Sequence, residues 1–409
     1  MSNEGQSNMT KPEGCAIAGG SAGASPFDWF AHMIENCLVY AREQRAAARP
    51  IVGIMCEFTP RELIMAAGGV PVLLCGGSAK TIPAAEHFLP SNLCPLIKST
   101  FGFSVEKSNP FLEMSDLVVA ETTCDGKKKM YELMAETRPM YVLELPQKPD
   151  SGDALEFWIA EIRKFKQELE SRFRVQITEQ ALRDAIAVMN RERTLRRALA
   201  EIMKVDTPPM TGRQLLDLRS SISGNPADVA QYEAALGLLK HSANVTGRAR
   251  DVRVLLTGVP IVHGDERVVD IIEQNGGLVV CLESCSGLKP LLDDVDETAA
   301  DPIRAIGEKY FHLPCSVMTR NDARLNVLRD LASAYRADCV IELTWQACLT
   351  YAVEAHRVRN LVERDLGLPY LHIETDYSPS DSARMQVRVE ALFETVRNHL
   401  ARPAAPTLP

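Results

Sequence analysis

Eleven cysteines give this 409-residue sequence its most distinctive chemistry, and their spacing excludes the simplest uses of a thiol. No two of them form a CxxC pair, which argues against a zinc ribbon and a thioredoxin-type redox site. Six follow predicted strands or lie in the loops beside them, where parallel sheets build their sites: Cys56, Cys94, Cys124, Cys285, Cys315 and Cys348. Soft thiolate ligands in numbers above four suggest an iron–sulfur cluster, so these six are the predicted metal ligands.

The other five cysteines have plainer explanations. Cys37 lies on the apolar face of a predicted helix, and Cys281 and Cys339 lie inside strand patterns, so all three are expected to be small buried hydrophobic residues. Cys15 falls in an N-terminal segment that is rich in Gly, Ser and Ala. Cys75, in LLCGG, is close to the predicted ligands and could replace Cys56 among them. A buried reduced thiol remains the alternative for any single member of the six.

A few other residues are candidates for proton transfer or for a polar wall. His263, in IVHGDER, is a candidate proton donor, with capping or a surface position as the alternative. Glu57 is a second catalytic candidate. Glu121 and Glu283 also lie at strand ends, and for all three glutamates the simpler interpretation is a polar wall or a charge at a helix N-terminus. The charged run at residues 193–204 is expected to be a solvated helix face. No GxxxxGK[ST] motif occurs, so the chain itself is not expected to hydrolyse ATP.

The elements that must position these side chains alternate along most of the chain. Residues 26–150 begin with one amphipathic helix (29–47) and continue as short apolar strands separated by helices, which is typical of a parallel, βαβ-built sheet. Residues 151–250 contain long charged amphipathic helices and no strand signal. The alternating pattern returns at 251–400, with a leader at 1–25 and a tail at 401–409. The sequence therefore predicts an α/β protein with two Rossmann- or flavodoxin-like parallel-sheet lobes and an intervening helical segment.

The second lobe repeats the order of the first. IVGIMC, PRELIMAAGG and VPVLLC correspond to VRVLLTG, ERVVDIIEQNGG and LVVCLESC, although any two βαβ units share part of this likeness. In this alignment Cys94 and Cys315 lie between corresponding elements, and Cys124 and Cys348 follow corresponding strands. We therefore expect the cysteines of both lobes to line one cleft between them.

Bulk properties narrow the class of protein. A net charge of −9 argues against nucleic-acid binding, which depends on an excess of Lys and Arg. No apolar run is long enough to span a bilayer, and the N-terminus lacks the pattern of a secretory signal. A cytoplasmic location without nucleic-acid or membrane partners is the expectation. There thiols stay reduced and serve metal binding or catalysis.

The cysteine segments also carry a family resemblance. IMCEFTPRELIMAAGGVPV, SNLCPLIKSTFG, ETTCDGKKKMYELM and the QACLTY…LGLPYLHIETDYS ending resemble the 2-hydroxyacyl-CoA dehydratase and benzoyl-CoA reductase subunit family. The resemblance covers nearly the whole chain after the leader. It implies that a subunit holds one [4Fe-4S] cluster through three cysteines, which by motif are Cys94, Cys124 and Cys348.

Three further cysteines depart from that pattern, namely Cys56, Cys285 and Cys315. This departure resembles a sub-branch, the double-cubane cluster proteins, which implies an [8Fe-9S] cluster held by six cysteines in a homodimer. It also implies low-potential reduction of small molecules such as acetylene, with electrons from an ATP-hydrolysing iron–sulfur activator. The charged helical surface at residues 156–197 is the predicted docking site for that activator. The alternatives are a [4Fe-4S] subunit of a CoA-ester dehydratase or reductase, and a non-catalytic electron carrier.

Overall fold

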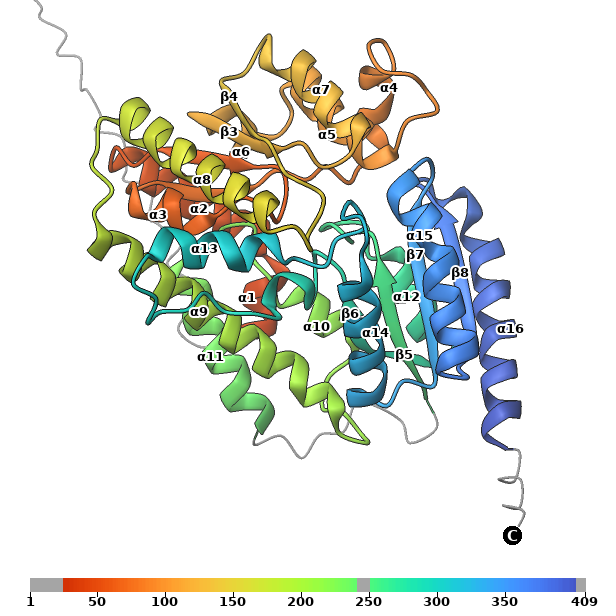
Figure 1. Cartoon of the computed structure of the whole chain (residues 1–409). Coiled ribbons are helices and arrows are strands. Elements are labelled where there is room, and N and C mark those ends of the chain that lie inside the picture. Colours follow the sequence, from red (N-terminus) through yellow and green to blue (C-terminus); the bar gives the residue numbers. More distant parts are fainter. Residues whose placement is uncertain (1–24, 241–250, 402–409) are drawn as a thin grey trace, which may run out of the picture.

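The computed structural model describes residues 25–240 and 251–401, and it confirms the predicted α/β fold. Two four-stranded parallel sheets are each flanked by helices (Figure 1). The first sheet has the order β2-β1-β3-β4, with bounds Val70–Leu73, Ile51–Ile54, Leu117–Glu121 and Met140–Leu143. The second has the order β6-β5-β7-β8, with bounds Gly277–Glu283, Val252–Gly258, Cys339–Trp345 and Tyr370–Thr375.

Burial explains which segments became strands. Every residue of β1, β3, β6 and β7 is buried, whereas the edge strands β4 and β8 are only partly covered. Continuous Val, Ile and Leu runs suit strands that are covered by helices on both faces. In each sheet the chain moves from the first strand out to one edge and then crosses back. The third strand therefore lies beside the first, and such a reversal opens a crevice at the carboxyl ends of the strands.

Helices cover both sheets and fill the region between them. In the first half they are α1 (Pro26–Ala31), α2 (Met33–Ala46), α3 (Arg61–Ala66), α4 (Ile82–Ala85), α5 (Pro95–Glu106), α6 (Pro110–Met114) and α7 (Asp125–Ala135). The middle helices are α8 (Gly152–Phe173), α9 (Glu179–Glu201), α10 (Gly212–Asp217) and α11 (Pro226–Lys240). The second half has α12 (Arg267–Gln274), α13 (Pro302–Phe311), α14 (Asp322–Ala334), α15 (Leu349–Asn360) and α16 (Ser382–Leu400).

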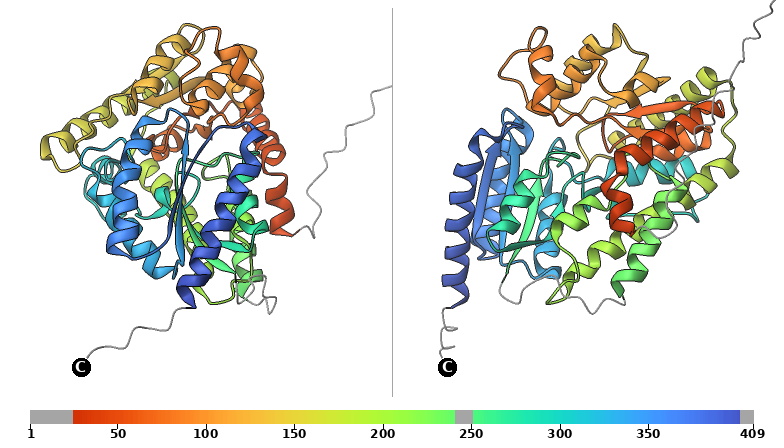
Figure 2. Two further views of the ribbon diagram at one scale, coloured as in Figure 1. Left: turned by 90° about the vertical axis from the view of Figure 1, so that its right-hand side faces the viewer. Right: turned by 180° about the vertical axis from the view of Figure 1, so that it is seen from behind.

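The middle helices tie the two halves together. In Figures 1 and 2, α13 from the second half runs along α8, and α9 packs against α3 of the first half. Helices α12 and α16 pack against each other and against the second sheet. One hydrophobic core contains buried residues from both sheets, so the halves share their packing. Among the described residues, none of the helices combines the length and apolar character needed to cross a membrane.

Two details differ from the sequence-based expectation. The helix predicted at residues 29–47 is two helices, α1 and α2, because the backbone turns at His32 (φ −109°, ψ 27°), whose Nδ1 lies 2.9 Å from the Asp28 carbonyl oxygen. The segment between α10 and α11 also adds an antiparallel bridge between Ile222 and Val72 to the edge of the first sheet. This bridge brings a Ser-rich loop of the helical segment to the sheet that carries the first cysteines.

Candidate functional site

Three of the six predicted cysteines cap helices. Cys94 is the N-cap residue of α5, Cys124 of α7 and Cys348 of α15. Backbone amides of the first helical turn interact with each sulfur and act to lower its pKa, namely those of Leu96 and Ile97, of Lys127, and of Tyr351 respectively. A helix N-terminus favours negative charge, and N–H···S bonds stabilise a thiolate. Each of the three sulfurs therefore lies at the positive end of a helix.

These three thiols come from both halves and lie together. The Cys94 and Cys348 thiols interact directly, and this interaction lowers the pKa of Cys94 and raises that of Cys348 well above its ordinary value. Cys124 interacts with Cys348 and Cys315; burial raises its pKa first, and the neighbouring thiolates raise it further. The sequence alignment of the two halves predicted this convergence, and the structure places the three thiols in one group.

The other three predicted cysteines continue the same group. Burial raises the pKa of Cys56 well above its ordinary value, and the thiolates of Cys285 and Cys315 add to that effect. Burial likewise raises the pKa of Cys285 to about 12, with Cys315 and Cys75 among the groups that add to it. Cys315 acts electrostatically on Cys124, Cys56 and Cys285, and it thereby links the thiols of this group to the three helix-capping cysteines.

Cys75 has a position in the fold that the sequence did not make clear. It lies two residues after β2, and Cys285 lies two residues after the corresponding strand β6. Cys75, and not Cys56, is therefore the positional counterpart of Cys285, and it lies close to Lys127. The choice between Cys56 and Cys75 as a ligand stays open. Three other cysteines are buried in the core as predicted, namely Cys37, Cys281 and Cys339, and Cys15 lies outside the described residues.

Each half also brings one ammonium group to the thiols. Lys127 Nζ donates to the Met55 carbonyl oxygen at 2.9 Å and lies near Cys56 and Cys124. Lys289, 1% exposed, donates to the Tyr351 hydroxyl at 2.7 Å and lies near the thiols of the second half. Burial lowers the pKa of both amines, but the neighbouring anions and phenols outweigh it and the net direction is upward. Sequence reasoning missed both lysines, which stand three and four residues after Cys124 and Cys285.

The donor set fits an anionic iron–sulfur cluster better than a single ion. Within residues 25–240 and 251–401, no group of three or more His, Cys, Asp or Glu side chains has the arrangement of a metal-ion site. Thiolates around a multi-iron cluster stand farther apart than those around one ion, because the cluster lies between them. Thiols from two halves, first-turn amides and two ammonium groups are the surroundings that stabilise and tune such a cluster.

A cavity of about 330 Å³ lies beside this set of thiols, with Cys56, Cys75 and Cys285 in its wall. Both predicted catalytic residues line it as well. Glu57 accepts a hydrogen bond from Arg61 Nη2 at 2.7 Å, and His263 Nδ1 lies 3.6 Å from Glu266 Oε1. The structure thus brings Glu57 and His263 to the same space as the thiols. Glu121 and Glu283 are instead fully buried, where they accept hydrogen bonds from Thr59 and Thr257.

The expectation of a solvated helix face at residues 193–204 is wrong for one side of α9. Met189, Glu192, Arg193 and Arg196 recur at helical spacing and line the cavity. Arg193 is 2% exposed and lies 2.5 Å from Glu62 of α3. A buried charged helix face and an exposed one have the same residue pattern in the sequence. The buried face is recognised only from the carboxylate, far away in the sequence, that pairs with it in the structure.

Comparison with known proteins agrees with this arrangement. The family model "2-hydroxyglutaryl-CoA dehydratase, D-component" matches residues 56–396, a range that includes all six predicted cysteines. The chain belongs to this family. It is therefore related to dehydratase and reductase subunits.

Relatives of this chain match it over different shares of its length. It is 40% identical to "Putative dehydratase subunit YjiM" of Escherichia coli (strain K12), over 90% of this chain and 97% of that protein. It is 30% identical to the lactoyl-CoA dehydratase subunit beta of Anaerotignum propionicum, over 37% of this chain and 40% of that one. It is 23% identical to a benzoyl-CoA reductase subunit of Thauera aromatica, over 69% and 74% of the two chains.

Proposed function

We propose that this chain is the iron–sulfur subunit of an enzyme of the 2-hydroxyacyl-CoA dehydratase type, with Cys94, Cys124 and Cys348 as ligands of a [4Fe-4S] cluster. The observation that carries the proposal is that all three cysteines are N-cap residues of helices and converge from two halves of the chain. The family match and the names of the relatives support the same class of reaction.

The surrounding residues have separate roles in this proposal. A bound cluster supplies one-electron chemistry at low potential. The first-turn amides orient the three thiolates, and Lys127 and Lys289 offset negative charge beside them. In the adjoining cavity, Glu57 and His263 are positioned to move protons, and Arg61 holds Glu57 through its ion pair. The packing of the two halves around the thiols limits access of water.

A second candidate is a double-cubane reductase of small molecules, in which all six cysteines hold an [8Fe-9S] cluster. The observation that favours it is the continuity of the thiols through Cys315, which interacts with Cys56, Cys124 and Cys285. In this candidate the chain acts as a homodimer. Cys94, Cys124 and Cys348 are cluster ligands in both candidate functions.

Both candidates include an ATP-hydrolysing iron–sulfur activator as the electron donor. The proposed docking surface is the charged side of α8 and α9 at residues 156–197, where exposed pairs such as Arg191 with Glu233 and Arg163 with Asp301 lie. We expect reduction of the protein to require the activator, its reductant and Mg-ATP together. Equal reduction by the reductant alone would contradict an ATP-driven donor.

Anaerobic iron and sulfide analysis tests the proposal and separates its two forms. About four irons per chain support the single-cluster form, and about eight support the double cubane. EPR spectra of the reduced protein identify the cluster type. Protein that binds no iron under reconstitution with ferrous iron and sulfide contradicts both candidates.

A further inference from the structure

The cavity beside the thiols carries more positive than negative side chains. Its lining includes five cations, Arg61, Lys127, Arg193, Arg196 and Arg219, against the two carboxylates Glu57 and Glu192. Several of these groups are already paired, as Arg61 is with Glu57 and Arg193 with Glu62. Of the three remaining cations, Lys127 lies near the thiols, and Arg196 and Arg219 lie on the rest of the cavity wall.

Arg196 has little compensation for its charge. Across the described part of the chain its one ion pair is a long contact of 3.5 Å to Glu192, and its side chain is 16% exposed. The other carboxylate oxygen of Glu192 accepts the Gly224 N–H at 2.7 Å. A guanidinium group has five N–H donors, so most of those of Arg196 remain available to the cavity.

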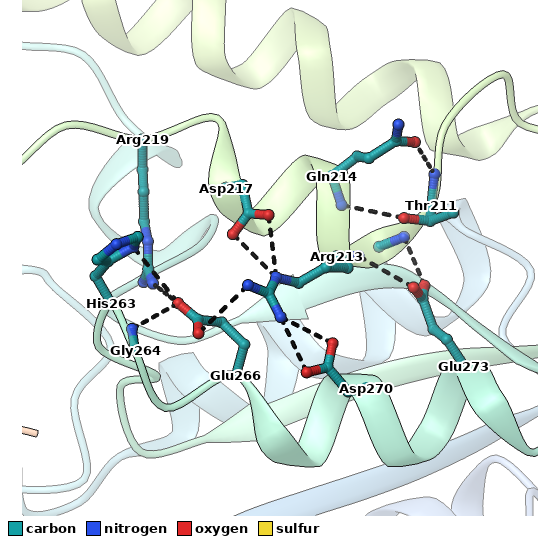
Figure 3. A network of polar contacts seen from close by, with 11 residues as sticks. Thr211, Arg213, Gln214, Asp217, Arg219, His263, Gly264, Glu266, Asp270 and Glu273 are labelled. Atoms are coloured by element: carbon teal, nitrogen blue, oxygen red, sulfur yellow. Dashed lines mark hydrogen bonds and ion pairs between the residues drawn. The ribbon is translucent and has the colours of Figure 1, made fainter. Parts of the chain in front are cut away.

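Arg219 is held in place but is also undercompensated. Figure 3 shows its guanidinium directed to Glu266, which lies 3.4 Å away and also faces His263, Gly264 and Arg213. Its Nη1 donates to the carbonyl oxygen of Ile261, which also accepts the Ser286 hydroxyl next to Cys285. Burial lowers the pKa of Arg219 to about 10, with repulsion from Arg196 and Arg213 in the same direction. It is still a cation at neutral pH.

A third observation points to the same cavity. Arg61 is 5% exposed and lines the cavity, and its buried Nε has no hydrogen-bond partner within the residues that the structure describes. Ser221 and Ser223 add hydroxyl groups to the wall between α10 and α11. Buried donors without acceptors are costly, and an anionic ligand supplies the missing acceptors.

We propose that Arg196 and Arg219 together bind the carboxylate of a small-molecule substrate. Two guanidinium groups that share a partly buried wall suit a planar carboxylate, because each offers parallel N–H donors. A volume of about 330 Å³ lies in the range of small-molecule sites. The other end of the molecule lies toward Cys56, Cys75 and Cys285 of the same cavity. The orientation of the molecule toward these cysteines rests on the proposed function, whereas the binding of its carboxylate by the two arginines does not.

Calorimetric titration of the purified protein with glutarate tests the proposal, with glutaramide and inorganic phosphate as parallel probes at constant ionic strength. We expect glutarate to bind to protein both with and without iron. Arg196→Gln should weaken this binding about tenfold or more, since each lost charge-assisted hydrogen bond acts on affinity directly. Arg196→Lys should recover part of the loss. Arg219→Gln should have a similar effect, and Arg196→Gln remains informative if loss of the Ile261 contact disturbs the Arg219 variant.

Arg329→Gln is the matched control, because Arg329 is an exposed arginine outside the cavity lining and its contact with Asp365 is as long, at 3.5 Å, as that of Arg196 with Glu192. It should bind glutarate as the natural chain does and keep the same iron content. Unchanged glutarate affinity in Arg196→Gln, equal binding of glutaramide, or binding of phosphate alone overturns the carboxylate site. If the natural chain binds glutarate but binds no iron, the proposed function is contradicted and the carboxylate site is not.

Discussion

The Cys94 thiol, at the start of α5 in the first half, interacts directly with the Cys348 thiol at the start of α15 in the second half. Neither half alone presents both sulfurs. A cluster bound there joins the two halves, so cluster binding and the packing of one half on the other stabilise each other.

Removal of a helix-capping cysteine should remove iron. We expect Cys94→Ala, Cys124→Ala and Cys348→Ala each to lower the iron content sharply, because each substitution deletes a proposed thiolate ligand at a helix N-terminus. Anaerobic iron analysis together with visible absorbance measures the loss. Cys339→Ala is the control, since Cys339 is a buried core residue of β7 and should leave iron content unchanged. If one of these variants retains all its iron, the cysteine that it lacks is not a cluster ligand.

The residues of the site differ in how far the sequence could predict them. The positions of Cys124 and Cys348 were predictable because strand-to-helix transitions recur in both halves and bring such positions to one edge of each sheet. Arg196 and Arg219 were not, because their burial depends on contacts with loops far away in the sequence. The same holds for Lys289, whose partner Tyr351 follows a different strand.

The strands were predictable for a simpler reason than the site. Their short Val, Ile and Leu runs show burial directly, and the helices between them repeat in a fixed order. The break between α1 and α2 was not predictable, since the apolar pattern continues across His32. The bridge from Ile222 to Val72 was missed because a single pair of residues leaves no period in the sequence.

Arg324 should be essential for stability. It is fully buried and lies within 3.4 Å of carboxylate oxygens of Glu283, Glu342 and Glu354. Arg324→Met leaves buried carboxylates without their cation, and we expect a loss of about 3–5 kcal/mol in the free energy of unfolding. Urea denaturation followed by circular dichroism measures the change.

Arg329→Met, on the exposed side of the same helix, is the control for Arg324. Its contact with Asp365 is 3.5 Å long, and both side chains are about half exposed. Such a surface pair contributes about 0–1 kcal/mol. Equal destabilisation in both variants would contradict the interpretation that burial of the carboxylates sets the cost.

Asp265 should make stability depend on pH. Burial raises its pKa to about 7, and its Oδ2 has no hydrogen-bond partner within the described residues. The ordinary pKa of an Asp side chain is about 3.9. Between this pH and the raised pKa, the folded protein therefore holds a proton that the unfolded chain has lost. The stability that this proton contributes is therefore present at low pH and is lost as pH rises through about 7.

The variant Asp265→Asn removes this titration and keeps the size of the side chain. We expect it to raise the free energy of unfolding relative to the natural chain at about pH 8, with a smaller difference at about pH 5.5. Urea denaturation at the two pH values checks this. Asp293→Asn, at an exposed carboxyl group, is the control and should show no such pH-dependent difference. A gain that is equal at both pH values would assign the effect to something other than the Asp265 proton.

The last prediction concerns Gly77, where the loop after β2 meets the loop after β5 in the cavity wall. A Cβ placed on Gly77 would lie 1.7 Å from Val262 Cγ2, and the β-branched Val262 side chain has little freedom to move aside. Gly77→Ala should therefore push the two halves apart at the cavity and lower the melting temperature.

The double variant Gly77→Ala with Val262→Ala tests this contact, because it removes the methyl group that the new side chain meets. We expect the double variant to melt above the Gly77→Ala single variant, and thermal denaturation of all four forms gives the coupling between the two positions. Val262→Ala alone should cost little, since Val262 is only half buried. Independent, additive effects of the two substitutions would mean that the loops do not constrain each other, and that the close approach at Gly77 does not hold the two halves in register.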